Sequence, residues 1–174
     1  MAALNARIKR REVVRPLAPM ATMEAAQKYF SLDAGACADN FNAYNYMVLC
    51  ADAREIAREE IPAVVHHDGT SRIQIVRKDT DPLVHGYLKA LGNRTGIEVS
   101  VNTSLNIGSP IVQTIEQAVR TVLLRAKGLT AILAISRSGE AYFIWNERTC
   151  HKLPNANFPS LLQKWNSSSS SRPV

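Results

Sequence analysis

Segment 115–127 constrains the fold most, because its apolar residues repeat at the spacing of one face of an α-helix. The residues on this face are Ile115, Ala118, Val119, Val122, Leu123 and Ala126. Thr114 and Gln117 have the spacing of a capping box, and Gly128 is placed to end the helix. The sequence therefore predicts a helix with one buried face.

Two further helices have local start and stop signals. One is expected from about Pro82 to Leu91, with Asp81 as N-cap and Gly92 as terminator. A proline at the first helical position fits this assignment, because its missing N–H would have no helical partner there. The other is expected over residues 23–30, capped by Thr22.

The remaining ordered segments have strand patterns. Residues 63–66 and 72–76 flank Asp68-Gly69 and predict a hairpin, and residues 131–135 and 141–145 predict another. Single strands are expected over residues 46–51 and 97–102. Hairpins and helices are mixed without strict alternation, so the expected fold class is α+β (mixed α/β): a twisted mixed β-sheet with packed helices.

The chain has 174 residues, of which 46% are hydrophobic, enough for one domain with its own core. We assign residues 1–150 to this domain. Residues 151–174 contain scattered prolines and the run Ser167–Ser171, and they are expected to form a flexible tail.

Positive charge is concentrated at the start of the chain. The net charge is +6, and residues 1–15 contain five basic residues against one acidic residue, Glu12. This local charge favours an anion site, on which Lys9, Arg11 and Arg15 could converge, or a solvated basic arm. A nucleic-acid-binding patch is the weaker alternative, because aromatic residues make up only 6% of the chain and no stacking platform is visible.

The cysteines and the hydropathy pattern limit the cellular setting. Cys37, Cys50 and Cys150 are far apart without a CxxC motif, which indicates a reducing compartment and no zinc site. No apolar run could span a bilayer, and the basic N-terminus lacks the apolar region of a secretory signal. A cytoplasmic location is therefore expected.

Two polar clusters follow predicted strands. In the first, His66 and His67 would point to opposite faces of a strand, so a metal site is not expected. Its Asp68-Gly69 pair has turn chemistry, and Arg72 begins the return strand. The second cluster, residues 102–106, offers the hydroxyl and amide groups of Asn102, Thr103, Ser104 and Asn106 where an apolar strand ends.

Three motifs occur in order along the chain. Residues 9–19 have the form Lys-x-Arg-Glu-x-x-Arg-Pro-x-Ala-Pro. Residues 61–74 have the form Ile-Pro-Ala-Val-x-His-x-Asp-Gly-Thr-x-Arg-x-Gln. Residues 102–114 combine Asn-Thr-Ser-x-Asn with Gly-x-Pro-Ile-Val-x-Thr. Together these motifs resemble the C-terminal part of NodU/CmcH-type O-carbamoyltransferases, and the resemblance covers roughly residues 4–146.

The resemblance implies a YrdC-like module that uses ATP, with magnesium, and carbamoyl phosphate as substrates to form carbamoyl-adenylate. It assigns phosphate-binding roles to the matching cations and polar contacts to the third motif, with Arg11 the weaker assignment. The implied substrate- and nucleotide-binding residues are Lys9, Arg11, Arg15, Arg72, Asn102, Ser104 and Asn106. No catalytic nucleophile or general base is expected, because adenylation needs charge stabilisation and little covalent help.

The chain departs from the family pattern in two respects. The His-x-x-x-His metal motif and the N-terminal domain that carries it are missing, as is the Gly-Pro-Arg-Ala-Leu-Gly segment that supplies another arginine. We therefore expect a transferase fragment that works with the metal-containing domain in cis or trans, in nodulation-factor or antibiotic carbamoylation. The alternatives are a non-catalytic binding or interaction remnant of the same family, or a nucleic-acid-binding module.

Overall fold

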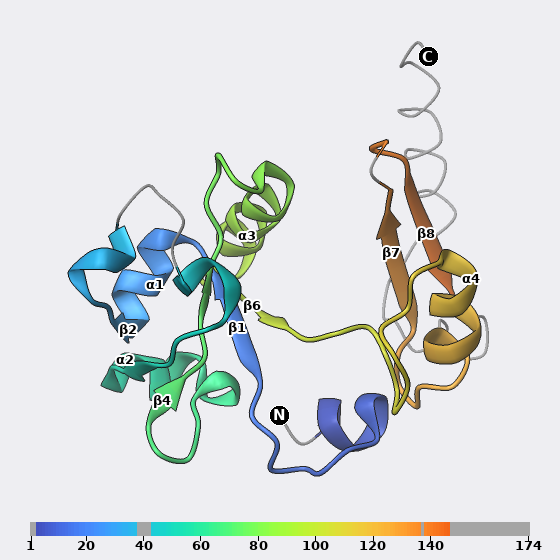
Figure 1. The fold of residues 1–174 in the computed structure, drawn as a ribbon, viewed down its shortest axis with the longest axis horizontal. Helices are drawn as coiled ribbons and strands as arrows, with labels where there is room; N and C mark the ends of the chain where they lie inside the picture. The colour runs from blue at the N-terminus through green and yellow to red at the C-terminus, as the bar shows by residue number, and fades with distance from the viewer. Residues whose placement is uncertain (1–2, 38–42, 137, 147–174) are drawn as a thin grey trace. The chain divides into compact units, whose positions relative to one another are not determined.

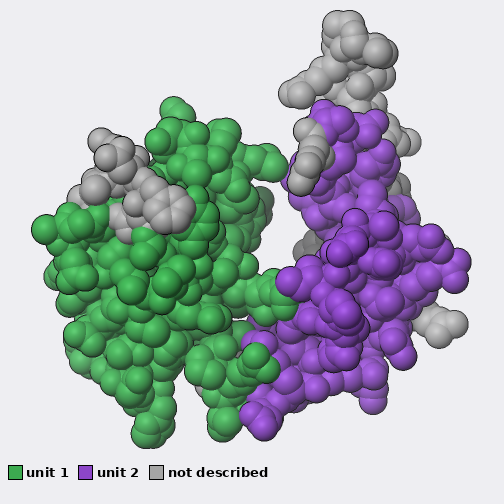
Figure 2. Space-filling model, viewed as in Figure 1, with its two compact units in different colours: residues 1, 14–104 green, residues 2–13, 105–174 purple. Residues whose placement is uncertain are grey.

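The computed structural model describes residues 3–37, 43–136 and 138–146. The chain divides into two compact units: unit 1 comprises residues 1 and 14–104, and unit 2 comprises residues 2–13 and 105–174 (Figure 2). Helices and strands alternate irregularly in both units, which confirms the expected α+β class (Figure 1). The expected tail and the expected domain boundary at residue 150 lie outside the described residues.

Unit 1 contains two small sheets. In the first, β1 (Ala18–Ala21) lies between β5 (Gln74–Ile75), to which it is parallel, and β6 (Val99–Asn102), to which it is antiparallel. The second is antiparallel and contains β2 (Phe30–Ser31), β3 (Ala51–Ala53) and β4 (Thr70–Ser71). The first sheet is therefore mixed, as expected. The strands are short, however, and they form two sheets in this unit instead of one.

Two helices of unit 1, α1 and α3, begin at the predicted caps. The Thr22 hydroxyl accepts the N–H of Ala25 at 3.2 Å at the start of α1 (Met23–Tyr29). The Asp81 carboxylate accepts the N–H of Val84 at 3.0 Å at the start of α3 (Pro82–Thr95). A third helix is α2 (Glu55–Glu60), and single 3-10 turns are η2 (Ala34–Cys37), η3 (Ala43–Tyr46) and η4 (Pro62–Val64).

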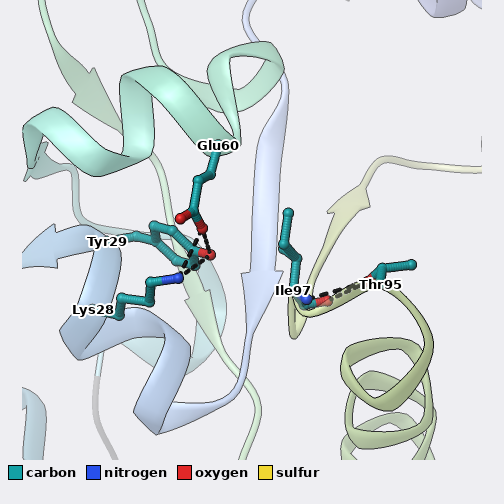
Figure 3. A network of polar contacts seen from close by, with 5 residues as sticks. All are labelled: Lys28, Tyr29, Glu60, Thr95 and Ile97. Carbon is teal, nitrogen blue, oxygen red and sulfur yellow. Dashed lines mark hydrogen bonds and ion pairs between the residues drawn. The ribbon is translucent and has the colours of Figure 1, made fainter.

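The core of unit 1 forms where α1 and α2 meet the strands. Its fully buried apolar side chains include Ala26, Tyr29, Phe30, Ala57, Ile73, Ile75 and Leu88. The Tyr29 hydroxyl donates to the Glu60 carboxylate at 2.5 Å, and the Lys28 ammonium reaches the same oxygen at 2.8 Å (Figure 3). Burial raises the pKa of Tyr29, and the Lys28 hydrogen bond lowers the pKa of Glu60. This contact joins α1 to α2.

The expected end of α3 was wrong by one turn. Gly92 lies inside the helix, and the chain leaves it at Gly96, which has φ 79°. A Cβ at position 92 would collide with the side chain of Glu98, so this glycine is needed for close packing and not for a turn. Sequence alone could not separate the two uses, because Gly92 and Gly96 stand one helical turn apart.

Two strand predictions in unit 1 were also wrong. Residues 46–51 form no strand before Ala51, and residues 43–46 form η3 instead. Residues 63–66 and 72–76 do not form a hairpin, because β4 pairs with β3 and β5 pairs with β1. The turn between them is as expected: Gly69 has φ 84°, and the Asp68 carboxylate accepts the Thr70 N–H at 3.0 Å.

Unit 2 contains the second hairpin in the predicted place. β7 (Ala131–Ile135) pairs antiparallel with β8 (Ala141–Trp145), in the register that places Leu133 opposite Phe143. The helical segment begins as α4 (Ile115–Gln117) and continues with wide π-type turns as η5 (Ala118–Leu123). The Thr114 hydroxyl accepts the Gln117 N–H at 3.1 Å, as predicted for the cap.

Most of the predicted helical face is buried. Ala118, Val122, Leu123 and Ala126 are buried, whereas Val119 is half-buried and Ile115 is 40% exposed. The N-terminal segment forms one more helix of the π type, η1 (Leu4–Lys9). It is joined to the end of this helical segment by a hydrogen bond of 3.1 Å from the Lys127 N–H to the Arg7 carbonyl.

Glu98 should stabilise unit 1 in a pH-dependent way. Its side chain is 22% exposed, and its carboxylate accepts from Lys89 at 2.6 Å and from Thr22 at 2.7 Å. These bonds hold its pKa below the ordinary value of 4.5. A carboxylate with a lowered folded pKa stabilises the protein above its unfolded pKa and loses that effect as the pH falls through the folded value. We expect Glu98→Gln to lower the free energy of unfolding at neutral pH by about 1–2 kcal/mol.

Urea denaturation of wild type and Glu98→Gln over a pH series checks this expectation. The difference between them should shrink as the pH falls below 4.5. Glu59→Gln is the matched control, because Glu59 is exposed on α2 and has no ion pair among the described residues. A difference that is the same at every pH would contradict the assigned role.

Candidate functional site

The seven residues that sequence analysis assigned to ligand binding are divided between the two units. Unit 1 contains Arg15, Arg72, Asn102 and Ser104, and unit 2 contains Lys9, Arg11 and Asn106.

Lys9 and Asn106, predicted separately from distant motifs, lie together in unit 2. Lys9 is the last residue of η1 and only 6% exposed, and its ammonium donates to the Asn106 side-chain oxygen at 2.5 Å. The Asn106 amide nitrogen donates in turn to the Ser109 carbonyl at 2.6 Å. A buried ammonium needs such partners, because an unpaired charge is expensive to remove from water.

The consecutive cations after η1 take separate partners. Arg10 has φ 51°, and its guanidinium donates to the Arg125 carbonyl at 2.6 Å. The Arg11 Nε donates to the Asn5 side-chain oxygen at 2.8 Å. In unit 2 these side chains therefore stabilise the turn after η1, where Lys9 binds Asn106 and Arg11 binds Asn5.

Asn5 is a structural residue that the sequence did not reveal. It is fully buried, and its amide nitrogen donates to the Val13 carbonyl at 3.0 Å while its oxygen accepts from Arg11. Its backbone carbonyl also accepts the Arg11 N–H at 3.0 Å. Asn5 thus fixes the path of the chain from η1 to Val13. An isolated asparagine in a short helix carries no sequence signal for this role.

A pocket of about 380 Å³ in unit 1 is the best candidate for a binding site. Asn102 at the end of β6 lines it, and its amide nitrogen donates to the Gln74 side-chain oxygen at 2.5 Å. β1 brings the two amides together, because it pairs with both β5 and β6. The other lining residues are Met20, Asn45, Tyr46, Ile75, Val76, Arg77, Thr80, Asp81 and Val84.

Arg77 supplies the positive charge of this pocket. Its Nε donates to the Asn45 side-chain oxygen at 3.3 Å, and its terminal nitrogen donates to the Ala36 carbonyl at 2.5 Å. It also borders a neighbouring pocket of about 550 Å³ that is lined by Met23, Glu24, Val76, Lys78, Asp79 and His85. Arg77 was not predicted from the sequence, although a cation directly after the apolar run that ends at Val76 was a usable signal.

The other predicted residues of unit 1 do not line the 380 Å³ pocket. Arg72 lies exposed between β4 and β5, and its side chain forms no hydrogen bond or ion pair with the described residues. Arg15 and Ser104 are also exposed, each with contacts of its own. The structure therefore groups Asn102 with Gln74 and Arg77, and not with Arg72.

The His66–Asp68 turn is held by its own hydrogen bonds. His66 Nδ1 lies 3.1 Å from the Thr70 hydroxyl, and that hydroxyl donates to Asp68 at 2.8 Å. The bond from the Thr70 backbone N–H lowers the pKa of Asp68. Across residues 3–37, 43–136 and 138–146, no three His, Cys, Asp or Glu side chains are grouped to hold a metal ion, and no helix has the length and apolar character to cross a bilayer.

Removal of the Asn5 amide should destabilise unit 2. Asn5→Ala leaves the Val13 carbonyl and the Arg11 guanidinium without this partner, and we expect a loss of about 2–3 kcal/mol in unfolding free energy. Asn5→Asp should lose less, because it keeps the acceptor for Arg11. Hydrogen exchange of η1 and η5 amides checks this, with exposed Asn93→Ala on α3 as control. Unchanged exchange in Asn5→Ala would contradict the role.

The family described as "Carbamoyltransferase C-terminus" matches residues 1–136. The chain is 35% identical over 121 residues to nodulation protein NolO of Bradyrhizobium diazoefficiens, covering 69% of this chain and 21% of NolO. It is equally identical, over 121 residues, to NolNO of Sinorhizobium fredii, covering 69% of this chain and 17% of that protein.

A third relative is the 3'-hydroxymethylcephem-O-carbamoyltransferase of Amycolatopsis lactamdurans, 37% identical over 99 residues, which cover 57% of this chain and 17% of that enzyme. The chain spans about a fifth of the length of the curated relatives that it matches. The family match extends over most of both units, and it confirms the resemblance read from the three motifs. The chain belongs to the carbamoyltransferase C-terminus family.

Proposed function

We propose that this chain is the carbamoyl-adenylate-forming module of an O-carbamoyltransferase, with ATP and carbamoyl phosphate as substrates. Family membership supports the reaction class. The observation that carries the site is the convergence of Gln74, Arg77 and Asn102 on one pocket of about 380 Å³.

The two amides of this pocket are suited to a carbamoyl group. Because Asn102 donates to Gln74, the Asn102 oxygen keeps its acceptor capacity and the Gln74 nitrogen keeps its donor capacity. A carbamoyl group presents the complementary pair, an NH₂ donor and a carbonyl acceptor. The amide pair could therefore bind this group with one bond in each direction.

Arg77 is suited to the phosphate. A guanidinium binds phosphate oxygens with two parallel N–H donors, and the contacts of Arg77 with Ala36 and Asn45 hold its plane in the pocket wall. In the proposed reaction, carbamoyl phosphate is hydrolysed to carbamate and phosphate. A carbamate oxygen then attacks the α-phosphorus of ATP, and pyrophosphate leaves. Fixed positive charge stabilises the charge that develops on the phosphorus oxygens.

The remaining assignments are part of the same proposal. Lys9, Arg11, Arg15, Arg72, Ser104 and Asn106 are proposed ligand contacts because they match the family motifs. Magnesium would enter with ATP as part of the substrate. Transfer of the carbamoyl group to an acceptor hydroxyl is proposed to need the further polypeptide that the relatives contain. We also propose that the reaction takes place in the cytoplasm, where ATP is supplied.

Removal of the Arg77 side chain should weaken carbamoyl phosphate binding. We expect Arg77→Ala to raise the dissociation constant at least about tenfold, the equivalent of about 1.4 kcal/mol. Lys78→Ala is the matched control, because Lys78 is exposed, lies next in sequence and lines only the neighbouring pocket. It should change the constant by less than about twofold.

Isothermal titration of the full chain with carbamoyl phosphate measures both constants, and thermal melting confirms that each variant is folded. Asn102→Leu should weaken binding as Arg77→Ala does, because it removes the acceptor for the carbamoyl NH₂. Equal affinities of wild type and Arg77→Ala for carbamoyl phosphate would show that the 380 Å³ pocket is not the binding site. Binding without pyrophosphate release would favour a non-catalytic binding subunit.

A further inference from the structure

One edge of β6 has main-chain groups without a partner. β6 is an outer strand of the sheet β5-β1-β6. Its register with β1 places Val99 opposite Ala21 and Val101 opposite Pro19, and the Thr22 N–H donates to the Glu98 carbonyl at 3.4 Å. In an antiparallel pair, hydrogen-bonded and non-hydrogen-bonded residue pairs alternate. Ser100 and Asn102 therefore bond to β1, and the N–H and C=O groups of Val99 and Val101 point away from it.

These outward groups have no hydrogen-bond partner among the described residues. Both valines are half-buried. A strand edge with unpaired donors and acceptors is a template for another strand.

An apolar groove of about 330 Å³ lies along the same edge. Val99, Ser100 and Val101 all line it, as expected for a groove along a strand edge, where residues that face both sides of the sheet come to the surface. Its apolar wall includes Ile61, Val64, Leu91 and Ile97. The Thr95 hydroxyl donates to the Leu91 carbonyl at 2.9 Å. It also accepts the Ile97 N–H at 3.2 Å (Figure 3), and the two bonds fix the turn from α3 into the groove.

We propose that this edge and groove bind an extended apolar strand contributed by the part of an O-carbamoyltransferase that lies outside the region matched here. Main-chain bonds to Val99 and Val101 would extend the sheet to four strands, and alternate side chains of the added strand would fill the groove. The inference rests on the proposed function for its occupant. The relatives support that choice, because this chain accounts for only 21% of NolO and 17% of NolNO.

Hydrogen exchange on the full chain alone tests the first step. Amides of Ser100 and Asn102 should be protected by β1, whereas those of Val99 and Val101 should exchange far faster. Equal protection of all four amides would show that the edge is already paired and would overturn the proposal.

Synthetic peptides test the occupant without requiring a second folded protein. The probes are overlapping peptides of about 15 residues, each long enough for one strand of 3–10 residues, that cover NolO outside its aligned 121 residues. We expect one contiguous stretch to bind and to protect the Val99 and Val101 amides. Val99→Pro should weaken this binding at least about tenfold, because it removes an outward N–H at the first strand position, where proline is tolerated. Val99→Thr keeps the N–H and should bind as wild type does.

The outcomes separate this inference from the proposed function. If no peptide binds, or if Val99→Pro binds as tightly as wild type, the strand site is refuted even when carbamoyl phosphate still binds. If wild type forms a dimer that Val99→Pro abolishes, the occupant is a second copy and the proposal is wrong. If peptides bind but carbamoyl phosphate does not, the strand site stands and the substrate assignment fails.

Discussion

The pairing of β1 on both of its edges is the constraint on which unit 1 depends. Met20 lies opposite Gln74 on one side and Ser100 on the other, so a four-residue strand fixes two segments far apart in the sequence. This pairing places Gln74 and Asn102 within one hydrogen bond of each other. A register shift of one residue would turn these side chains to the other face and would separate the amides. The geometry of the candidate site therefore follows directly from the sheet.

Buried polar groups restrict the conformation of the chain as much as the apolar core does. Asn5, Lys9, Thr22 and Ser71 are buried, and each has a hydrogen-bond partner: Val13, Asn106, Glu98 and Val64, respectively. Among the described residues, no buried side-chain nitrogen or oxygen lacks a partner. Such groups cost free energy when unpaired, so each one restricts the chain to a single local path. In unit 2 this restriction directs the cations after η1 to different partners.

Features set by neighbouring residues could be predicted from the sequence. The caps at Thr22, Asp81 and Thr114 could be predicted because each cap oxygen accepts a backbone N–H from only three residues further along the chain. The β7–β8 hairpin was found for the same reason. Features set by distant residues could not be predicted. Gly92 is needed because the side chain of Glu98 packs against it. Residues 63–76 form no hairpin because β4 pairs with β3 and β5 pairs with β1.

The candidate site shows the same division. The family motifs suggested Lys9, Asn102 and Asn106, but they did not predict the Lys9–Asn106 contact, which joins residues 97 positions apart. A hydrogen bond to the Ala36 carbonyl, 41 positions away, holds Arg77 in the pocket wall, and no local sequence pattern predicts that contact.

The most direct test of the central claim is pyrophosphate release from ATP by the purified chain, with and without carbamoyl phosphate. Carbamoyl-adenylate formation predicts release that depends on carbamoyl phosphate and is lost in Arg77→Ala. Release that is independent of carbamoyl phosphate, or none at all, would contradict the account.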